Sequence, residues 1–295
     1  MRVLVTNDDG VRAPGLAAMT RALARWAADH DGHHEVLVVA PLANHSGASA
    51  AVGTVYEREA VSYRRVRIEG AEDVPTYGVD APPALAVLLG SLGGFGGRPD
   101  LVVSGINLGV NVGRSVLHSG TVGATLAGAQ LGLRGLAVSL RAGSPPERWE
   151  TASTVAVSVL GALCDAPPRT VLNLNVPSVP LDDLRGLRRA RIASSGIVKQ
   201  ASANWMGPAS GGPAGGYGPA GGGDAEEGEV RLTLGTAIPT LGRPDESEDP
   251  ADDAALVAAG YASITPIVGV REDTSEDADE VVRAALATVH GVLGR

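Results

Sequence analysis

MRVLVTNDDG, residues 1–10, is the stretch that decides the fold. Its β-branched run at 3–6 is followed at once by a turn, and Pro14 then begins a segment whose apolar residues recur at helical spacing. The run EVLVVA at 35–40 is the next expected buried strand. A helix between two apolar strands is a βαβ unit, and the crossover of such a unit is right-handed.

The same alternation of strand and helix continues along the first half of the chain. Apolar runs without polar alternation indicate strands that are buried on both faces, as in parallel sheets. The further strands are expected at 101–104, 136–140 and 171–174, and the helices at 82–91, 121–132 and 149–164. The sequence therefore predicts an α/β core over residues 1–185, with a doubly wound, Rossmann-like and mostly parallel sheet.

The second half reads differently, because residues 207–228 are nearly all Gly, Ala, Pro and Ser, a composition typical of a flexible loop. Strand-like pieces flank this insert at 191–193 and 230–234, and GYASITP at 260–266 returns to strand character. We expect a C-terminal β-arm within 186–270. A terminal amphipathic helix is expected within 271–295. The apolar face of that helix carries Val282, Leu286, Val289 and Leu293.

Composition excludes several classes of protein. The chain has 24 Lys and Arg against 33 Asp and Glu, a formal charge of −9, and no basic stripe, which argues against binding a DNA or RNA polymer. Its one cysteine, Cys164, excludes a disulfide framework. No apolar run reaches the ~18 residues that span a membrane. Since the chain begins directly on a strand, we expect no signal peptide and a cytoplasmic protein.

Oxygen-bearing side chains follow three of the expected strands. In an open α/β sheet the ligand site lies outside the carboxyl ends of the strands, so these three loops are expected to meet. The first loop holds Asp8 and Asp9 side by side, and two such carboxylates repel each other unless a cation or a proton relieves them. Hard oxygen ligands suit Mg²⁺, Mn²⁺ or Ca²⁺ rather than zinc. The alternative is a solvated Asp-Gly turn.

The other two loops are rich in hydroxyl and amide groups. SGAS at 46–49 offers two hydroxyls and a backbone that can face an anion, although it can equally be an ordinary loop. Asn107, in SGINLGVNVG at 104–113, can give a carbonyl oxygen to a metal. The helix start at Ser119 to Thr121 is a natural phosphate seat, whether or not Ser119 also caps that helix.

These segments resemble the SurE family, the survival-protein E group of 5′/3′-nucleotidases. The resemblance is carried by MRVLVTNDDG at 1–10, VVAP with SGAS between 38 and 49, DLVVSGIN at 100–107, LHSGT at 117–121, NLNVP at 173–177 and GYASITP at 260–266. It extends over nearly the whole chain except the Gly-rich insert.

The resemblance implies one divalent ion per subunit, Mg²⁺ or Mn²⁺, held by Asp8, Asp9, Ser46 and Asn107. It implies a phosphatase acting on nucleoside 5′- and 3′-monophosphates, as a homodimer or homotetramer that exchanges C-terminal elements. Asp8 is expected to orient the attacking water as a base, Asp9 to bind the metal, and His118 to protonate the leaving oxygen. The expected phosphate contacts are Asn7, Ser104, Gly105, Asn111, Ser119, Gly120 and Thr121.

Two segments depart from the family pattern, at 42–45 after VVAP and at 78–83, where GVDAPP replaces a Gly-Thr-Pro-x-Asp-Cys segment. They leave open a phosphatase specialised for another phosphorylated metabolite, or a non-catalytic phosphate-binding homologue. Attack by Asp8 itself, giving a phospho-aspartate, is the rival to attack by water. A dinucleotide-binding oxidoreductase is excluded, because the first turn is Asn-Asp-Asp-Gly instead of Gly-x-Gly-x-x-Gly and its acids would repel a pyrophosphate.

Overall fold

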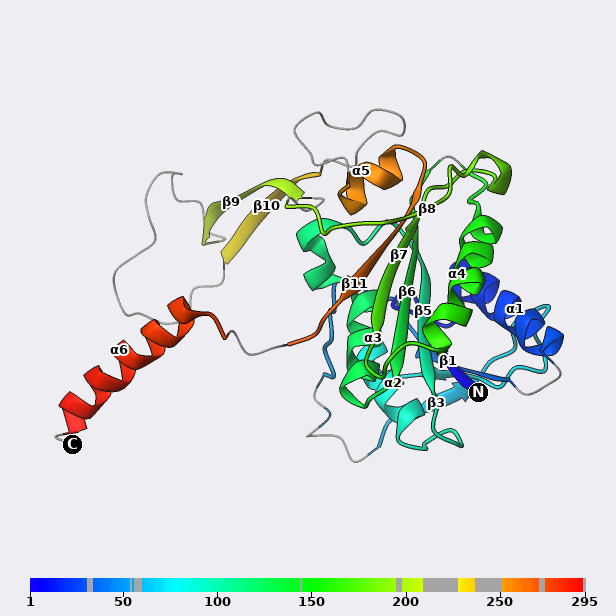
Figure 1. Ribbon diagram of the computed structural model, residues 1–295, viewed down its shortest axis with the longest axis horizontal. Coiled ribbons are helices and arrows are strands. Elements are labelled where there is room, and N and C mark those ends of the chain that lie inside the picture. The colour runs from blue at the N-terminus through cyan, green and yellow to red at the C-terminus, as the bar shows by residue number, and fades with distance from the viewer. Residues whose placement is uncertain are drawn as a thin grey trace.

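A nine-stranded sheet organises the computed structural model, which describes residues 1–30, 34–53, 55, 60–143, 145–194, 198–208, 228–236, 251–270 and 274–293 (Figure 1). Its strands are, from edge to edge, β3 (Tyr63–Arg65), β4 (Thr76–Val79), β2 (Glu35–Pro41), β1 (Arg2–Thr6), β5 (Leu101–Leu108), β6 (Arg134–Leu140), β7 (Val171–Val176), β11 (Ala262–Ile267) and β8 (Leu187–Arg189). The β3–β4 and β7–β11 pairs are antiparallel and the other pairs are parallel. The expected α/β class with a mostly parallel sheet is confirmed.

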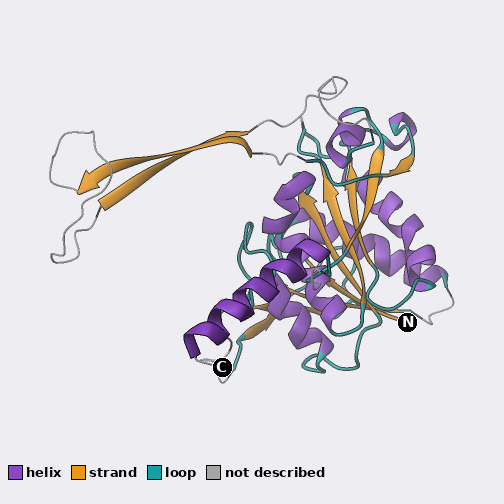
Figure 2. Cartoon of the chain, turned by 60° about the vertical axis from the view of Figure 1, so that its left-hand side comes forward, coloured by secondary structure: helices purple, strands orange, loops and turns teal. Residues whose placement is uncertain are grey.

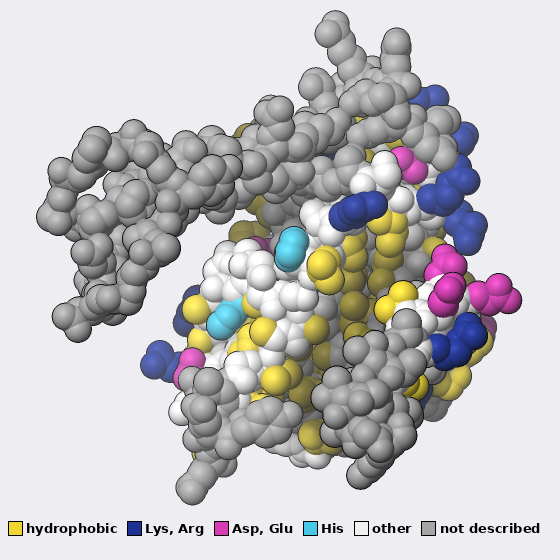
Figure 3. Space-filling model, turned by 90° about the vertical axis from the view of Figure 1, so that its left-hand side faces the viewer, with side chains coloured by type: hydrophobic (Ala, Val, Ile, Leu, Met, Phe, Trp, Pro, Cys, Tyr) yellow, Lys and Arg dark blue, Asp and Glu magenta, His cyan; other side chains and the backbone are white. Residues whose placement is uncertain are grey.

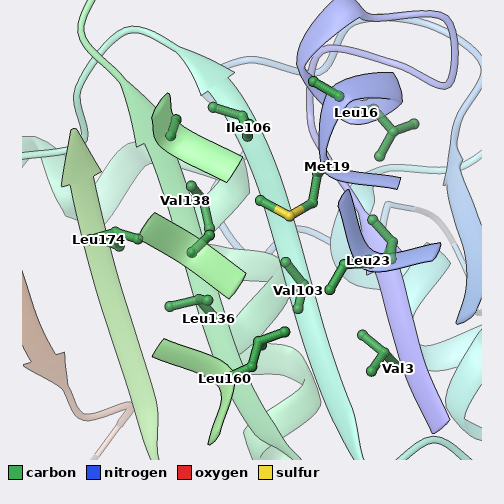
Figure 4. Packing of buried hydrophobic residues seen from close by; sticks show 14 of the residues in the cluster. Val3, Leu16, Met19, Leu23, Val103, Ile106, Leu136, Val138, Leu160 and Leu174 are labelled. Atoms are coloured by element: carbon green, nitrogen blue, oxygen red, sulfur yellow. The ribbon is translucent and has the colours of Figure 1, made fainter. Parts of the chain in front are cut away.

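Helices cover both faces of the sheet. Helices α1 (Pro14–Asp29) and α4 (Trp149–Cys164) lie on one face, and α2 (Pro83–Ser91) and α3 (Gly120–Gln130) on the other. Val3 packs with the α1 side chains in one cluster, which Figure 4 shows. Because side chains alternate along a strand, its neighbour Leu4 packs with α2 on the other face. Met19 and Leu23 of α1 are fully buried, and each such side chain contributes about 1.5–3 kcal/mol of hydrophobic stabilisation.

The chain changes direction across the sheet between β1 and β5. From β1 it proceeds to β2 and then to the β3–β4 edge, and it returns through α2 to β5 on the other side of β1. The ends of β1 and β5 are in register, with Thr6 opposite Ser104. Such a topological switch point is where open α/β sheets bind ligands, so the loops after β1 and β5 frame the expected site.

The C-terminal half departs in part from expectation. β8 and β11 join the central sheet, although both lie in the region expected to form the arm. The strand expected at 191–193 is wrong, since Arg191 makes only an isolated bridge to Asp252. The edge strands β3 and β4 and the short helix α5 (Asp253–Ala258) were not predicted, because each is too short to carry a clear period.

Two elements project from this body (Figures 1 and 2). β9 (Val198–Pro208) and β10 (Gly228–Thr236) form a separate two-stranded antiparallel sheet, called the arm below. It lies within 186–270, where a β-arm is expected, and β10 contains the strand expected at 230–234. Helix α6 (Glu276–Leu293) extends away from the sheet. Most of the insert expected at 207–228 lies outside the described residues. Among the helices that are described, none has the length and apolar character needed to cross a membrane.

Candidate functional site

The carboxylate of Asp8 lies at the carboxyl end of β1, against the first turn of α3. It is only 3% exposed, and the hydroxyl of Thr121 donates a hydrogen bond of 2.6 Å to its Oδ1. Gly120 leaves the space that the carboxylate occupies, since a Cβ there would come within 2.8 Å of Asp8 Cβ and 2.9 Å of its Oδ2. The first strand and the α3 N-terminus, far apart in sequence, are therefore in direct contact at this point.

Asp9, the adjacent residue, is half-buried and holds its proton unusually tightly. The pKa of Asp9 is raised from 3.8 to about 6. Burial is the largest cause, the charge of the neighbouring Asp8 acts in the same direction, and a hydrogen bond from the backbone N–H of Leu108 partly opposes both. In the part of the chain that the structure describes, neither carboxylate is ion-paired with Lys or Arg. Two carboxylates with so little compensation favour the approach of a cation.

The loop after β2 is attached to the same place. The backbone N–H of His45 donates to the carbonyl of Asp8 at 2.7 Å. Further along, Ser49 donates its backbone N–H to His118 and its hydroxyl to Leu117, at 3.2 Å and 2.7 Å. The three expected loops do meet, and the hydroxyl-bearing Ser46 lies exposed on the segment between these contacts.

The side chains expected to bind metal offer oxygen donors suited to a hard cation. Asn107, at the end of β5, donates its Nδ2 to the carbonyl of Gly109 at 2.7 Å, which leaves the amide oxygen as the end available to a metal. With Asp8, Asp9 and Ser46 this makes two carboxylates and two neutral oxygens, a set that fits Mg²⁺ or Mn²⁺. No group of three or more His, Cys, Asp or Glu side chains gathers within the described ranges, so a zinc-type cluster is not found there.

Asn111 is held by three residues, Ser139, Asn173 and Asn175, that were not expected to be part of the site. Its backbone N–H donates to Asn175 Oδ1 at 2.7 Å, and its carbonyl accepts from Asn173 Nδ2 at 2.8 Å and Asn175 Nδ2 at 3.0 Å. Its own Nδ2 donates to Ser139 Oγ at 2.8 Å. The sequence does contain a sign of this role: asparagines at alternate positions of the apolar strand β7 point to the same face of the sheet.

Three expected phosphate contacts lie inside the protein. Asn7 is fully buried and donates its Nδ2 to the carbonyl of Gly10 at 3.0 Å, which closes the turn after β1. Ser104 is also fully buried, within β5. A Cβ on Gly105 would lie 2.2 Å from the carbonyl oxygen of Val138, so this glycine permits the close approach of β5 and β6. All three residues are buried in this structure, and a contact between any of them and a phosphate stays a prediction.

The other expected contacts surround the start of α3. Ser119 caps the helix by accepting a hydrogen bond of 3.1 Å from the backbone N–H of Val122. Gly120 and Thr121 are buried, and the hydroxyl of Thr121 is occupied by Asp8. The side chain of His118, just before this turn, is exposed to solvent. A buried helix start beside two carboxylates is an arrangement that can hold a phosphate and a cation together.

Comparisons with known proteins show what this sequence and fold are similar to. The family model described as Survival protein SurE matches residues 3–199. The chain is 36% identical to the 5′/3′-nucleotidase SurE of Cronobacter sakazakii, with 100% of both proteins covered. It is also 36% identical to the 5′/3′-nucleotidase SurE of Escherichia fergusonii, with 90% of each covered. The crystal structure of the SurE protein from Aquifex aeolicus superposes with a TM-score of 0.66 at 26% identity, covering 94% of this chain and 95% of that one.

Proposed function

This chain belongs to the SurE family, and we propose that it is a metal-dependent phosphomonoesterase that hydrolyses nucleoside 5′- and 3′-monophosphates. Full-length similarity to proteins named 5′/3′-nucleotidase supports the enzyme class. The observation that carries the metal dependence is the Asp8–Asp9 pair: Asp8 lies against the start of α3, and Asp9 has a pKa of about 6. We expect the enzyme to act in the cytoplasm.

Asp8, Asp9, Ser46 and Asn107 are the residues that would hold the divalent ion. When bound, Mg²⁺ or Mn²⁺ neutralises negative charge on the phosphoryl oxygens and makes a water molecule more acidic. The remaining work falls to the protein. Thr121 fixes Asp8 Oδ1, so Oδ2 is the oxygen that can accept the proton of the attacking water.

Neutral hydrogen-bond donors complete the phosphate seat. The first backbone N–H groups of a helix have no partners within the helix, and α3 begins at Gly120. These groups, with the Asn111 side chain, would bind phosphoryl oxygens without adding charge. The side chain of His118 is exposed to solvent, so it would be able to give a proton to the leaving oxygen. Attack by water is favoured over attack by Asp8, because Thr121 and Gly120 hold the Asp8 carboxylate closely.

A second candidate is a phosphatase of the same mechanism that is specialised for another phosphorylated metabolite. The two segments that depart from the family pattern lie side by side, since the Leu42 N–H donates to the Val79 carbonyl at 2.8 Å. One cavity of 380 Å³ is lined by residues from or next to both segments, including His45, Asp80 and Pro82. Because this cavity is lined by segments that depart from the family pattern, it is where a leaving group other than a nucleoside would be recognised.

A hydrolysis panel tests the proposal. The purified protein is assayed with p-nitrophenyl phosphate, nucleoside 5′- and 3′-monophosphates and other phosphorylated metabolites, with Mg²⁺ or Mn²⁺ and with a chelator. We expect turnover that the chelator abolishes and added metal restores. Preference for a non-nucleotide ester would favour the second candidate, and phosphate binding without any turnover would favour a non-catalytic homologue.

We also propose that β9–β10 and α6 join two copies of this chain in a homodimer or homotetramer. On α6, Val281, Val282 and Leu286 are 70%, 56% and 52% exposed. Figure 3 looks onto the face from which the arm and α6 project, and hydrophobic side chains gather there in a band. A second copy of the chain would cover these exposed hydrophobic side chains.

Light scattering tests this assembly. The double variant Val282→Asp with Leu286→Asp should have a lower measured mass than the wild type. A monomeric wild type would contradict the proposed assembly.

A further inference from the structure

A buried carboxylate outside the proposed site, that of Asp253, is surrounded by backbone donors. Asp253 is fully buried at the start of α5. Its Oδ1 accepts hydrogen bonds from the backbone N–H groups of Gly113, Ala193 and Ala254 at 3.1, 3.1 and 2.9 Å. Its Oδ2 accepts from Gly113 at 3.0 Å. One side chain therefore joins three separate segments of the chain.

Each of these segments has a distinct place in the molecule. Gly113 begins the 3₁₀ turn Gly113–His118, which follows Asn111 and leads to the start of α3. Ala193 lies at the base of the arm, five residues before β9 begins at Val198. Ala254 belongs to α5, at the point where the chain has returned from the arm. Asp253 thus connects the loop beside the expected phosphate seat to both ends of the arm.

Packing around this carboxylate forms a small core of its own. Val110 and Val112 of the site loop pack with Ala193 and with Ala254 and Val257 of α5, and these five side chains are a cluster separate from the main core. The loop at 110–113 is therefore held from two directions. Asn173 and Asn175 hold it from the sheet, and Asp253 holds it from the C-terminal side.

The position of Gly113 gives this clamp a consequence for the site. Gly113 has a φ of +57°, in the left-handed region, so the backbone turns sharply at the residue that Asp253 holds. A buried carboxylate is stable only where hydrogen bonds replace its lost hydration, and here backbone N–H groups supply them. Removing the carboxylate leaves the N–H groups of Gly113 and Ala193 without this acceptor, and the loop then has no fixed position on that side.

We propose that Asp253 is a positioning residue for substrate binding: it holds the 110–113 loop so that Asn111 and the start of α3 meet the phosphoryl group together. It does not touch the substrate. This role rests on the proposed phosphatase function. Asp8, Asp9 and Ser46 come from other loops, and Asn107 lies within β5 with its side chain held by Gly109, before the 110–113 loop begins. Asp253 therefore acts on substrate affinity and leaves metal affinity unchanged.

The test compares Asp253→Ala with Asp253→Asn in the full-length protein. Loss of a binding contact that is equal in ground state and transition state raises KM with little change in kcat, so Asp253→Ala should raise KM roughly tenfold or more. The asparagine keeps Oδ1 as an acceptor and should restore KM to within about threefold of wild type. Calorimetric titration of Mn²⁺ should give the same Kd for both variants and the wild type.

Val257→Ala is the matched control, since it loosens the same small core without removing any of these hydrogen bonds. It should lower the Tm and leave KM unchanged. If Val257→Ala raises KM as much as Asp253→Ala, or if Asp253→Ala lowers kcat and Mn²⁺ affinity instead, the positioning role is overturned.

The affinity for inorganic phosphate, titrated in the presence of Mn²⁺, separates the two proposals. A wild type that binds phosphate without hydrolysing esters would contradict the proposed function alone. Asp253 would still be supported if its alanine variant bound phosphate roughly tenfold more weakly than that wild type. Equal phosphate affinity in the two proteins would overturn the positioning role whatever the activity.

Discussion

Two of the three pairs of consecutive aspartates, Asp8–Asp9 and Asp252–Asp253, differ in how their buried carboxylates are hydrogen-bonded. Asp253 is fully buried, yet backbone N–H groups from three segments donate to it. Asp9 is only half-buried, and the backbone N–H of Leu108 is the donor that lowers its pKa. Burial raises the pKa of both residues. The difference lies in the number of donors around each carboxylate.

That difference separates a structural carboxylate from one that is available for chemistry. Where backbone donors surround the oxygens, as at Asp253, the carboxylate fixes the chain and most of its capacity to accept hydrogen bonds is already used. Where two carboxylates share few donors, as at Asp8 and Asp9, a cation is the partner that stabilises both. The same Asp-Asp dipeptide thus has two different roles, and the number of backbone N–H donors around the carboxylates determines which role it has.

The largest expected effect is that of Asp8→Asn. The amide keeps the shape and an oxygen that can accept from Thr121, but it loses the charge and the basic oxygen. We expect kcat for phosphomonoester hydrolysis to fall about a thousandfold or more, with little change in Tm. Steady-state kinetics with Mn²⁺ measures this. Asp29→Asn, at an exposed position on α1, is the control, and rates like those of the wild type in Asp8→Asn would defeat the mechanism.

Gly120→Ala moves the carboxylate without removing it. The new Cβ would lie 2.8 Å from Asp8 Cβ and must displace it, and a displacement of this size costs about ten- to a hundredfold in kcat. Gly161→Ala is matched to it, because Gly161 is also in a helix but a Cβ there meets nothing within 4 Å. The control should keep full activity and gain up to about 1 kcal/mol of stability. Equal activity of the two variants would argue that Asp8 has no fixed position.

The sequence predicted the elements with long apolar periods and the residues at strand ends. Strands β1, β2 and β5 and helices α1 and α4 lie where they were expected, because several turns or a fully apolar run carry each of them. The meeting of the three loops also followed from the sequence, since parallel strands bring their carboxyl ends to one edge.

Contacts that depend on which backbone atoms come together could not be predicted. The sequence around Asp253 does not distinguish it from a solvated aspartate, because two of its three donor residues lie 60 and 140 positions away. Ser104 and Asn7 carry groups typical of phosphate contacts, and only the packing of β5 and β1 reveals that both are buried. Sequence supplies the kind of donor, and tertiary structure decides which donors face the ligand.

The pH dependence of metal binding gives a smaller effect. The folded-state pKa of Asp9, about 6, is above the ordinary value of 3.8, so metal-free folded protein holds the proton more tightly than unfolded protein does. The contribution of this proton to the free energy of unfolding of the metal-free protein is full below pH 3.8 and is lost as the pH rises through about 6. A divalent ion competes with that proton.

Thermal unfolding checks this linkage. Saturating Mn²⁺ should raise Tm more at about pH 7.5 than at about pH 5. Asp9→Asn removes the proton in question, so the metal-free variant should lose the pH dependence that the wild type shows between these values. An equal gain in Tm from Mn²⁺ at both pH values would mean that Asp9 is not a ligand.

The smallest effect is expected from shortening the arm. Pro208 and Gly228 face each other at the ends of β9 and β10, so a two-residue Asn-Gly turn can replace residues 209–227. All proposed metal ligands lie between residues 8 and 107, and their contacts are with α3 and the neighbouring loops. The shortened protein should therefore show the same Mn²⁺-dependent gain in Tm and the same kcat for p-nitrophenyl phosphate. Loss of the Mn²⁺-dependent gain in Tm would mean that the arm supplies part of the metal site. The arm would then share the function of the Asp8–Asp9 pair and would not be a purely structural element like Asp253.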